Sequence, residues 1–329
     1  MQFARAVCVV AYALPGLALP GTPLLAADTA ANYPSRPVRI VSGSPGGTAD
    51  ITARVIGQKL SERFKQQMVI DNRASAGGVV GAEIVANAAP DGHTLYVTGV
   101  NTQVSAPLLI KNISFDPLRD FAPISLITNS GLVVTVTPAL GVNNLKDFVA
   151  LAKSRPHGLL YASASAGTSS HLTGALFTQV MGINLVHVPY KGAGFTLTAL
   201  LTGEVQTAFL STTTTSGQIR AGKLKAIALL NDKRFAGAPD IPTAAEQGFK
   251  GLESYVWFGL YAPGKTPRTI IDKINREVKS ILSLQELKAA MLQQGAEVVY
   301  TTPEEFDKFQ RAEIIKWSKV IRDAKLQAQ

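Results

Sequence analysis

Residues 38–48 read VRIVSGSPGGT, and this segment gives the strongest indication of the fold in the whole chain. The apolar start is typical of a buried strand, the glycine-rich middle of a tight turn, and the final threonine of a helix N-cap. A strand that runs through such a turn into a helix is the repeating unit of an α/β sheet. Ligands of these sheets bind beyond the carboxyl ends of the strands, which is where this turn lies.

Strand and helix patterns continue to alternate after this segment. Apolar runs at residues 38–42, 68–71 and 94–98 are typical of strands, and the helical patterns between them cover residues 48–64 and 77–88. In the first helix the apolar residues gather on one face, as expected of a helix that packs on a sheet. The first part of the chain is therefore predicted to be an α/β lobe.

A second block repeats the alternation. Strands are expected near residues 159–162, 185–188, 205–209 and 225–230, with helical patterns between them. Right-handed crossovers make each block a mostly parallel sheet with helices on both faces. The predicted fold class is therefore α/β with two Rossmann-like lobes.

Two more strand-like segments, at residues 132–137 and 255–261, have no helix to pair with inside either block. We interpret them as two crossing strands that form a hinge. The helical stretches at residues 267–294 and 303–323 then return to the first lobe.

These assignments give predicted boundaries for the two lobes. Residues 28–132 together with 258–329 form lobe 1, residues 133–257 form lobe 2, and a ligand cleft lies between them. About 300 residues exceed the usual size of one hydrophobic core, which also favours two domains.

Residues 1–27 are interpreted as a signal peptide. Arg5 is basic, residues 6–19 are almost wholly apolar, and Leu25-Ala26-Ala27 ends in small residues suited to cleavage. This apolar run is too short to cross a hydrocarbon core, which needs about 20 residues. We expect a soluble, monomeric protein in the periplasm. The sole cysteine, Cys8, leaves with the leader, so the mature chain has no thiol for a disulfide, a zinc site or a nucleophile.

The charge of the chain favours an anionic partner. The formal net charge of +9 becomes +8 once Arg5 is removed, and its long-range field attracts anions. Nucleic acid is not expected, because the basic residues are scattered, aromatic residues make up only 7%, and no basic stripe carries stacking side chains.

Three loops at the ends of predicted strands carry the candidate ligand-binding residues. They span residues 42–50, 163–171 and 188–194, and they offer hydroxyls, backbone N–H groups and positive helix ends. Such groups can hold an anion without burying an opposing charge. The alternative is that these residues only form turns and cap helices, and that Lys191 is an ordinary exposed lysine. The predicted ligand contacts, with one serine that follows a later strand, are Ser42, Gly43, Ser44, Gly46, Gly47, Thr48, Asp50, Ser163, Ser165, Gly167, Thr168, Ser169, His171, Tyr190, Lys191, Gly192 and Ser211.

Catalytic, cofactor and metal motifs are incomplete. Residues 217–224 nearly match a P-loop, but Leu224 replaces the magnesium-binding hydroxyl, and the dinucleotide-like start at Gly192 lacks its third glycine. The four histidines include no pair at zinc-ligand spacing, and no G-x-S-x-G elbow is present. We predict no catalytic residues, no metal and no cofactor.

Several motifs together resemble a known receptor family. The chain is similar to the tripartite tricarboxylate transporter substrate-binding proteins, also called Bug receptors, from about residue 33 to its end. The motifs that carry the resemblance are Tyr33-Pro34-Ser35-Arg36-Pro37, Pro45-Gly46-Gly47-Thr48-Ala49-Asp50, Asp71-Asn72-Arg73 with Ala76-Gly77-Gly78, Ala88-Ala89-Pro90-Asp91-Gly92, Phe121-Ala122-Pro123, His187-Val188-Pro189-Tyr190-Lys191-Gly192, Ala221-Gly222-Lys223-Leu224 and Trp257-Phe258-Gly259-Leu260.

The resemblance implies a type II periplasmic-binding-protein fold whose two lobes close on a small organic acid. It implies delivery of that acid to the subunits of a membrane permease, and no catalysis. The chain departs from the family pattern at Ser42 and Gly43, where relatives carry a proline and a bulky residue, which predicts a roomier and wetter pocket. Leu210 and Ser211 replace an acid and an amide, which makes an amino-acid ligand less expected, whereas Ala175 in place of a glutamate has no clear effect.

The working hypothesis is a periplasmic receptor that closes two lobes on a mono- or dicarboxylate. Two other functions stay open at this point. One is an enzyme on the same scaffold, which would need an acid-base pair, although Asp50 is the only acid in the three loops. The other is a sensory protein that presents its liganded form to a membrane kinase.

Overall fold

The computed structural model describes residues 31–43, 45, 48–75 and 78–326. The predicted signal peptide, with Cys8, lies outside these residues, and so do Ser44, Gly46 and Gly47 of the first candidate loop.

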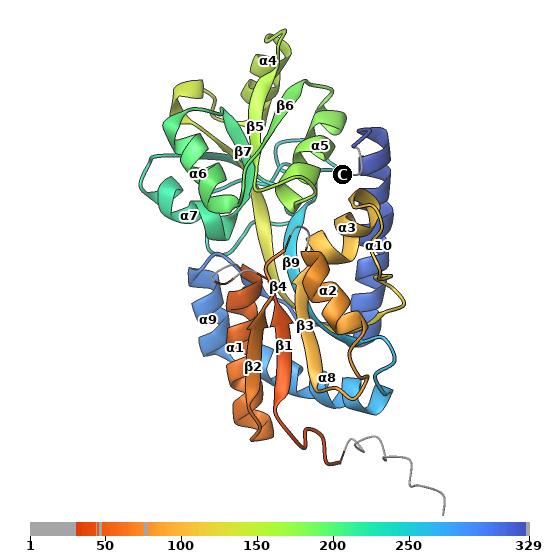
Figure 1. The fold of residues 1–329 in the computed structure, drawn as a ribbon. Helices are drawn as coiled ribbons and strands as arrows, with labels where there is room; N and C mark the ends of the chain where they lie inside the picture. The colour runs from red at the N-terminus through yellow and green to blue at the C-terminus, as the bar shows by residue number, and fades with distance from the viewer. Residues whose placement is uncertain (1–30, 44, 46–47, 76–77, 327–329) are drawn as a thin grey trace, which may run out of the picture.

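The first lobe contains a three-stranded parallel core. Strand β1 (Val38–Ser42) pairs with β2 (Met68–Asn72) on one side and with β3 (Thr94–Gly99) on the other. Helices α1 (Thr48–Phe64) and α2 (Val79–Ala86) connect these strands. The predicted strand-helix alternation is confirmed here, and both lobes are visible in Figure 1.

The second lobe repeats this arrangement. Strands β5 (Leu159–Ser163), β6 (Leu185–Pro189) and β7 (Thr207–Ser211) run parallel, with β5 in the middle. The helices of this lobe are α4 (Leu145–Lys153), α5 (Ser169–Met181), α6 (Ala193–Thr202) and α7 (Thr212–Arg220).

Two long strands join the lobes. Strand β9 (Tyr255–Pro263) pairs antiparallel with both β3 and β4 (Phe121–Val136), and the far end of β4 pairs antiparallel with β7 and with β8 (Lys225–Leu229). The strand order is β2-β1-β3-β9-β4-β7-β5-β6. Each sheet is therefore parallel in its outer strands and antiparallel where the two joining strands enter.

Three predicted details need correction. Strand β4 begins at Phe121 and not at residue 132, because its first half pairs along β9 despite Pro123 and two register shifts. The stretch predicted as one helix over residues 267–294 is two helices, α8 (Arg268–Leu282) and α9 (Gln285–Gln293). A π-helical turn, η2 (Asn101–Ser105), with α3 (Ala106–Leu109) follows β3 without having been predicted. The remaining short elements are η3 (Pro138–Leu140) and β10 (Glu297–Val298), which pairs with β4.

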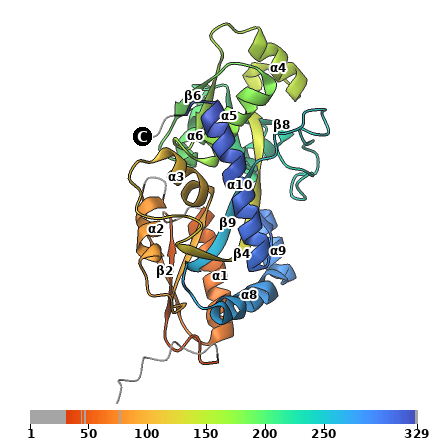
Figure 2. The same cartoon turned by 90° about the vertical axis from the view of Figure 1, so that its right-hand side faces the viewer.

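Helix α10 (Pro303–Asp323) runs along the side of the molecule past both lobes (Figures 1 and 2). A capping box starts it, because the Thr302 hydroxyl accepts from the Glu305 N–H while the Glu305 carboxylate accepts from the Thr302 N–H. The Gln179 side chain of α5 donates to the Val320 carbonyl at 3.0 Å, which ties α10 to the second lobe.

The described part of the chain contains no helix with the length and apolar character needed to cross a membrane. Its buried apolar side chains pack mainly in two groups. One lies between β1, α1 and α8 in the first lobe, and the other extends from the first lobe through β4, α5 and α10.

Candidate functional site

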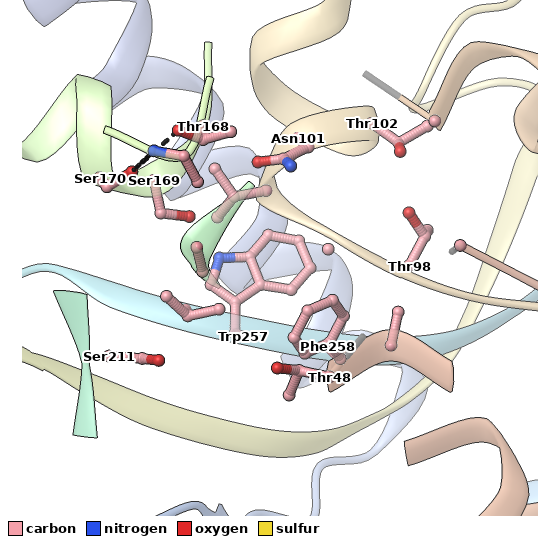
Figure 3. Close-up of a pocket in the computed structure, with 18 of the residues that line it drawn as sticks. Thr48, Thr98, Asn101, Thr102, Thr168, Ser169, Ser170, Ser211, Trp257 and Phe258 are labelled. Carbon is pink, nitrogen blue, oxygen red and sulfur yellow. Dashed lines mark hydrogen bonds between the residues drawn. The ribbon is translucent and has the colours of Figure 1, made fainter. Parts of the chain in front are cut away.

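A cavity of about 330 Å³ lies between the two lobes. Its walls come from loops after β1, β2 and β3 on one side, from loops after β5 and β6 and the end of β7 on the other, and from the start of β9. The parallel strands of both lobes thus end at the cavity, as the α/β rule predicts. Figure 3 shows Thr48, Asn101 and Thr102 of the first lobe, Thr168, Ser169 and Ser170 of the second, and Trp257 with Phe258 between them.

The N-termini of five helices reach this cavity. Thr48 begins α1, Gly78 precedes α2, Thr168 precedes α5, Ala193 begins α6, and Ser211 precedes α7. Each of these helices has eight or more residues and directs its first backbone N–H groups and its positive end this way. Together they make the cavity attractive to a negative charge.

The loop 163–171 is held together by its own short side chains. The Thr168 hydroxyl donates to the Ser165 carbonyl at 2.7 Å, and the Ser170 hydroxyl accepts from the Ala164 N–H at 3.0 Å. The N–H of Gly192 donates to the Ala164 carbonyl at 2.7 Å, which joins this loop to the start of α6. The backbone at the start of α5 is therefore fixed in position before any ligand arrives.

Arg73 is the single Lys, Arg, Asp or Glu side chain among the described residues that line the cavity. Its Nε lies 3.0 Å from Asp71 Oδ1, and no other partner of its guanidinium is found in the described part of the chain. Burial on its own would raise the pKa of Asp71, but hydrogen bonds from Arg39 and Arg73 lower it below the usual range. Asp71 therefore stays ionised and steadies Arg73 at the edge of the cavity.

The wall formed by the joining strands is apolar. Trp257 and Phe258, near the centre of the view in Figure 3, belong to this wall, and Leu132, Leu210 and Val256 line the cavity as well. The cavity therefore offers apolar surface as well as hydrogen-bond donors.

Five of the predicted contacts lie on the cavity wall. They are Gly43, Thr48, Thr168, Ser169 and Ser211. Their role as ligand contacts stays a prediction.

Asp50 and Ser42 are turned away from the cavity into the first lobe. Asp50 is buried, pairs with Arg54 Nε at 2.9 Å and accepts from Asn72 Nδ2 at 2.9 Å. Ser42 is also buried, and its hydroxyl has no partner among the described residues. Ser42, which stands where relatives carry a proline, is therefore not part of the cavity wall, whereas Gly43, which stands where they carry a bulky residue, does line the cavity.

Seven predicted contacts of the second lobe lie beside or behind the wall. The Tyr190 hydroxyl donates to Glu204 at 2.8 Å, Lys191 is exposed, and His171 is buried beneath the loop. The other members of this set, whose backbone or side chains support the loops, are Ser163, Ser165, Gly167 and Gly192. Sequence position alone does not say which way each of these side chains points.

Several cavity residues were not predicted. Arg73 and Trp257 belong to motifs that were noticed but not assigned to the site, and Asn101 and Thr102 follow β3, where the strand-end rule would have pointed to them. Ser75, Tyr96, Thr98 and Phe258 line the cavity as well. No group of three or more potential metal ligands occurs among the described residues.

The chain is similar to a family of receptors. The model of the tripartite tricarboxylate transporter family receptor matches residues 52–326. Protein BugT of Bordetella pertussis is 34% identical, with 98% of each chain covered.

Two solved structures show ligands in similar proteins. The structure of R. palustris Rpa4515 with adipate has 31% identity and a TM-score of 0.82, and the match covers 90% of this chain and 100% of that one. MatC of Rhodopseudomonas palustris with bound malate has 30% identity and a TM-score of 0.77, with 88% and 100% covered.

Proposed function

This chain belongs to the tripartite tricarboxylate transporter family of receptors, and on that basis we propose that it captures a small organic carboxylate in the periplasm for a membrane permease. The family and its structural relatives are solute-binding receptors and not enzymes. The predicted family and the prediction that the protein is not an enzyme are therefore both confirmed. The two-lobed α/β fold is confirmed by the same comparisons.

One observation carries the proposal of an anionic ligand. Five helix N-termini and Arg73 face a cavity whose described lining contains no Asp or Glu. Neutral donors and one cation would bind a carboxylate by charge-assisted hydrogen bonds, which are the stronger class of hydrogen bond. An ammonium group would find no charged partner among these residues, which favours an organic acid over an amino acid.

The shape of the cavity favours a ligand with an apolar middle. The partly exposed side chains of Val256 and Phe258 provide hydrocarbon surface in the same cavity as the donors at Thr168–Ser170 and the guanidinium of Arg73. Adipate and malate, found in the two similar structures, are both small dicarboxylates, and about 330 Å³ is ample for molecules of that size. We therefore place dicarboxylates first among the acids to be tested.

Binding is proposed to bring the lobes together. Residues 28–132 with 258–329 would move against residues 133–257 about β4 and β9, because donors from both lobes can satisfy one ligand only when they are close. Export to the periplasm would remove residues 1–27, and mass spectrometry of periplasmic extract should then find Asp28 at the N-terminus.

The test is calorimetric titration of protein that has been unfolded and refolded to remove carried-over ligand. Mono-, di- and tricarboxylates, amino acids, sugars and amines should be compared. We expect saturable binding of an acid that is recovered unchanged. If only uncharged compounds or amines bound, the anion site would be refuted while the family assignment stood.

A backbone variant makes this test specific. Ser169 is the first residue of α5, and Thr168 before it has φ −74° and ψ 161°, which suits a following proline. Ser169→Pro removes one N–H from the cavity wall but keeps the helix start, and Ser169→Ala controls for the lost hydroxyl. We expect Ser169→Pro to bind the acid about tenfold or more weakly than Ser169→Ala. Equal affinity of the two variants would mean that this N–H does not contact the ligand.

A further inference from the structure

Two histidines lie stacked beneath the cavity loop. His171 is in the first turn of α5 and His187 is in β6, and their ring centroids are 3.9 Å apart with planes 13° from parallel. His171 is 8% exposed and His187 is partly buried, so water reaches the stack mainly from the side of His187. Neither ring lines the cavity, and the binding mechanism proposed above does not use them.

Hydrogen bonds fix the proton on each ring. The Gly167 N–H donates to His171 Nδ1 at 3.0 Å, so Nδ1 carries no proton and Nε2 carries it. The Ser163 hydroxyl donates to the Ser165 carbonyl at 3.0 Å, so it must accept from His187 Nε2–H at 2.6 Å. The His171 ring is therefore neutral, His187 carries a proton on Nε2, and each ring binds a residue of the loop 163–171.

These bonds support the part of the loop that meets the other lobe. Gly167 has a φ of +75°, a conformation that favours glycine. A methyl group placed on its Cα would lie 3.3 Å from Leu109 Cδ1 and 3.7 Å from the Ser105 hydroxyl, both in the first lobe. The backbone held by His171 thus lies at the contact between the lobes, one residue before Thr168 of the cavity wall.

The surroundings of the stack favour neutral rings. Tyr161 in β5 faces His187, with 4.9 Å between ring centroids, and its hydroxyl donates to the His171 carbonyl at 3.4 Å. Burial lowers the pKa of both histidines to about 4, and repulsion from a charge on His171 is a smaller part of the lowering at His187. Burial raises the pKa of Tyr161, so its phenol is neutral as well. Within the described residues, the two imidazoles and this phenol are the titratable groups found to face one another here.

We propose that His171 and His187 are positioning residues for the cavity loop, and that protonation of the stack loosens this loop and weakens ligand binding in acid. A proton on His171 Nδ1 would point at the Gly167 N–H and replace an attraction by a repulsion. Two protonated rings 3.9 Å apart would also repel each other. The part of this proposal that concerns the ligand rests on the function proposed above, whereas the part that concerns the loop does not.

Substitutions can separate the hydrogen bond from the ring. In His171→Asn the amide oxygen can take the place of Nδ1 as acceptor, and in His187→Gln the amide nitrogen can take the place of Nε2 as donor. Neither side chain titrates. His171→Ala removes the acceptor altogether. His157→Gln is the matched control, because His157 is exposed in the turn before β5.

The first measurement is hydrogen exchange of the Gly167 amide without ligand at pH 7. We expect exchange to be at least tenfold faster in His171→Ala than in the wild type, and close to wild type in His171→Asn and in His157→Gln. Equal protection of this amide in all four proteins would overturn the positioning role. This result is obtained whether or not any carboxylate binds, so it is independent of the proposed function.

The second measurement is the affinity for adipate or malate from pH 7 to pH 3.5, with circular dichroism to verify folding at each pH. The wild type is compared with the double variant His171→Asn/His187→Gln. Protonation of the organic acid itself weakens its binding to both proteins equally, so this effect cancels in the comparison. The dissociation constant of the wild type divided by that of the double variant should rise about two- to fourfold between pH 7 and pH 3.5. A ratio that stays constant would refute the acid effect. If neither acid bound the wild type at pH 7, malate and adipate would be excluded as ligands. The acid effect would then be tested by NMR titration of the histidine ring protons, and two of the four histidines are expected to titrate near pH 4.

Discussion

At the scale of single residues, Arg73 gives the clearest indication of the ligand's charge distribution. It approaches the cavity from the loop after β2, away from the helix starts of the second lobe. Its side chain is 45% exposed and is anchored by Asp71 at one nitrogen only, so the rest of the guanidinium can turn toward a ligand. If the ligand is a dicarboxylate, as proposed, we expect one carboxylate to meet Arg73 and the other to meet backbone N–H groups.

Arg73→Gln should discriminate between acids with one and two carboxylates. We expect the affinity for a dicarboxylate to fall about tenfold, because one charge-assisted hydrogen bond is lost, and the affinity for a monocarboxylate to change less than twofold. Calorimetry measures both, and Arg155→Gln, at an exposed turn, controls for the change in net charge. Equal loss for both kinds of acid would place Arg73 at the first carboxylate instead.

Two helical glycines show how local packing decides the effect of a methyl group. In Gly174→Ala, in α5, the new Cβ would overlap the ring of Tyr161, whereas in Gly217→Ala, in α7, no atom lies within 4 Å of it. We expect Gly174→Ala to lower the free energy of unfolding by about 2 kcal/mol and Gly217→Ala to raise it by about 0.5–1 kcal/mol. Urea denaturation checks both values. Stabilisation by Gly174→Ala would show that Tyr161 moves aside without cost.

At the scale of elements, helix α10 fixes the back of the cavity. The indole N–H groups of Trp257, in β9, and Trp317, in α10, both donate to Glu313 Oε2 at 3.0 Å. Gln310 of the same helix donates to Gln103 Oε1 at 3.0 Å, and Gln103 belongs to η2, which also carries Asn101. Buried polar side chains of α10 thus position two elements that line the cavity.

Substitution of Glu313 should separate hydrogen bonding from charge. Glu313→Leu leaves two buried indole N–H groups unpaired, so we expect a loss of about 3 kcal/mol in unfolding free energy and severalfold weaker ligand binding. Glu313→Gln keeps an acceptor and should lose about 1 kcal/mol. Urea unfolding followed by tryptophan fluorescence reports on this cluster directly, because the chain has only these two tryptophans.

Lys308→Gln, at an exposed position of α10, is the control for these variants. If Glu313→Leu unfolded at the same urea concentration as Lys308→Gln, the two indoles would have to find other partners, and the positioning role of Glu313 would be wrong.

The elements that local patterns determine were predicted well. The expected helices at residues 48–64 and 303–323 have the same bounds in α1 and α10, because apolar periodicity and capping residues mark their ends. The first half of β4 was missed, since its extended conformation depends on pairing with β9, which is distant in sequence. Pairing between distant segments leaves little trace in the local pattern of either one.

The candidate site divides in the same way. Thr48 and Ser169 were found because they start helices just after strands, which is a local pattern. Asn101 and Trp257 were missed because their place on the wall depends on how η2 and β9 meet across the two lobes. His171 was predicted to contact the ligand but does not line the cavity, because its ring stacks on His187 beneath the loop.

At the scale of the whole molecule, the two lobes share one continuous connection. Strand β4 pairs with β9 along Phe121–Gly131 and continues into the second lobe, where it pairs with β7 and β8, and α10 packs against β4 and α5. The stability of the second lobe is therefore coupled to that of the first, and a change buried in one lobe should be seen in the unfolding of the whole chain.

The buried histidine stack predicts how this stability depends on pH. In the unfolded chain both rings take up protons near the usual pKa of 6.5, whereas burial lowers the pKa of each to about 4 in the folded protein. Between these values the unfolded state binds more protons than the folded state, so acid favours unfolding. The contribution of the neutral histidines to the free energy of unfolding should be fully present above about pH 6.5. It should decrease as the pH is lowered, and protonation of these histidines should cause no further decrease below about pH 4. His171 contributes on the order of 3 kcal/mol over the whole window, and the less buried His187 contributes less because water screens its charge.

Urea unfolding at pH 7, 6, 5 and 4 isolates this effect when the wild type is compared with His171→Asn/His187→Gln. The carboxylates are the same in both proteins, and those with lowered pKa values, such as Asp71, lose their contribution at lower pH. The double variant should therefore lose much less stability than the wild type from pH 6.5 to pH 4, whereas His157→Gln should follow the wild type. Parallel losses in the wild type and the double variant would mean that the stack is already hydrated, because only contact with water would let the folded rings take up protons at the same pH as the unfolded chain.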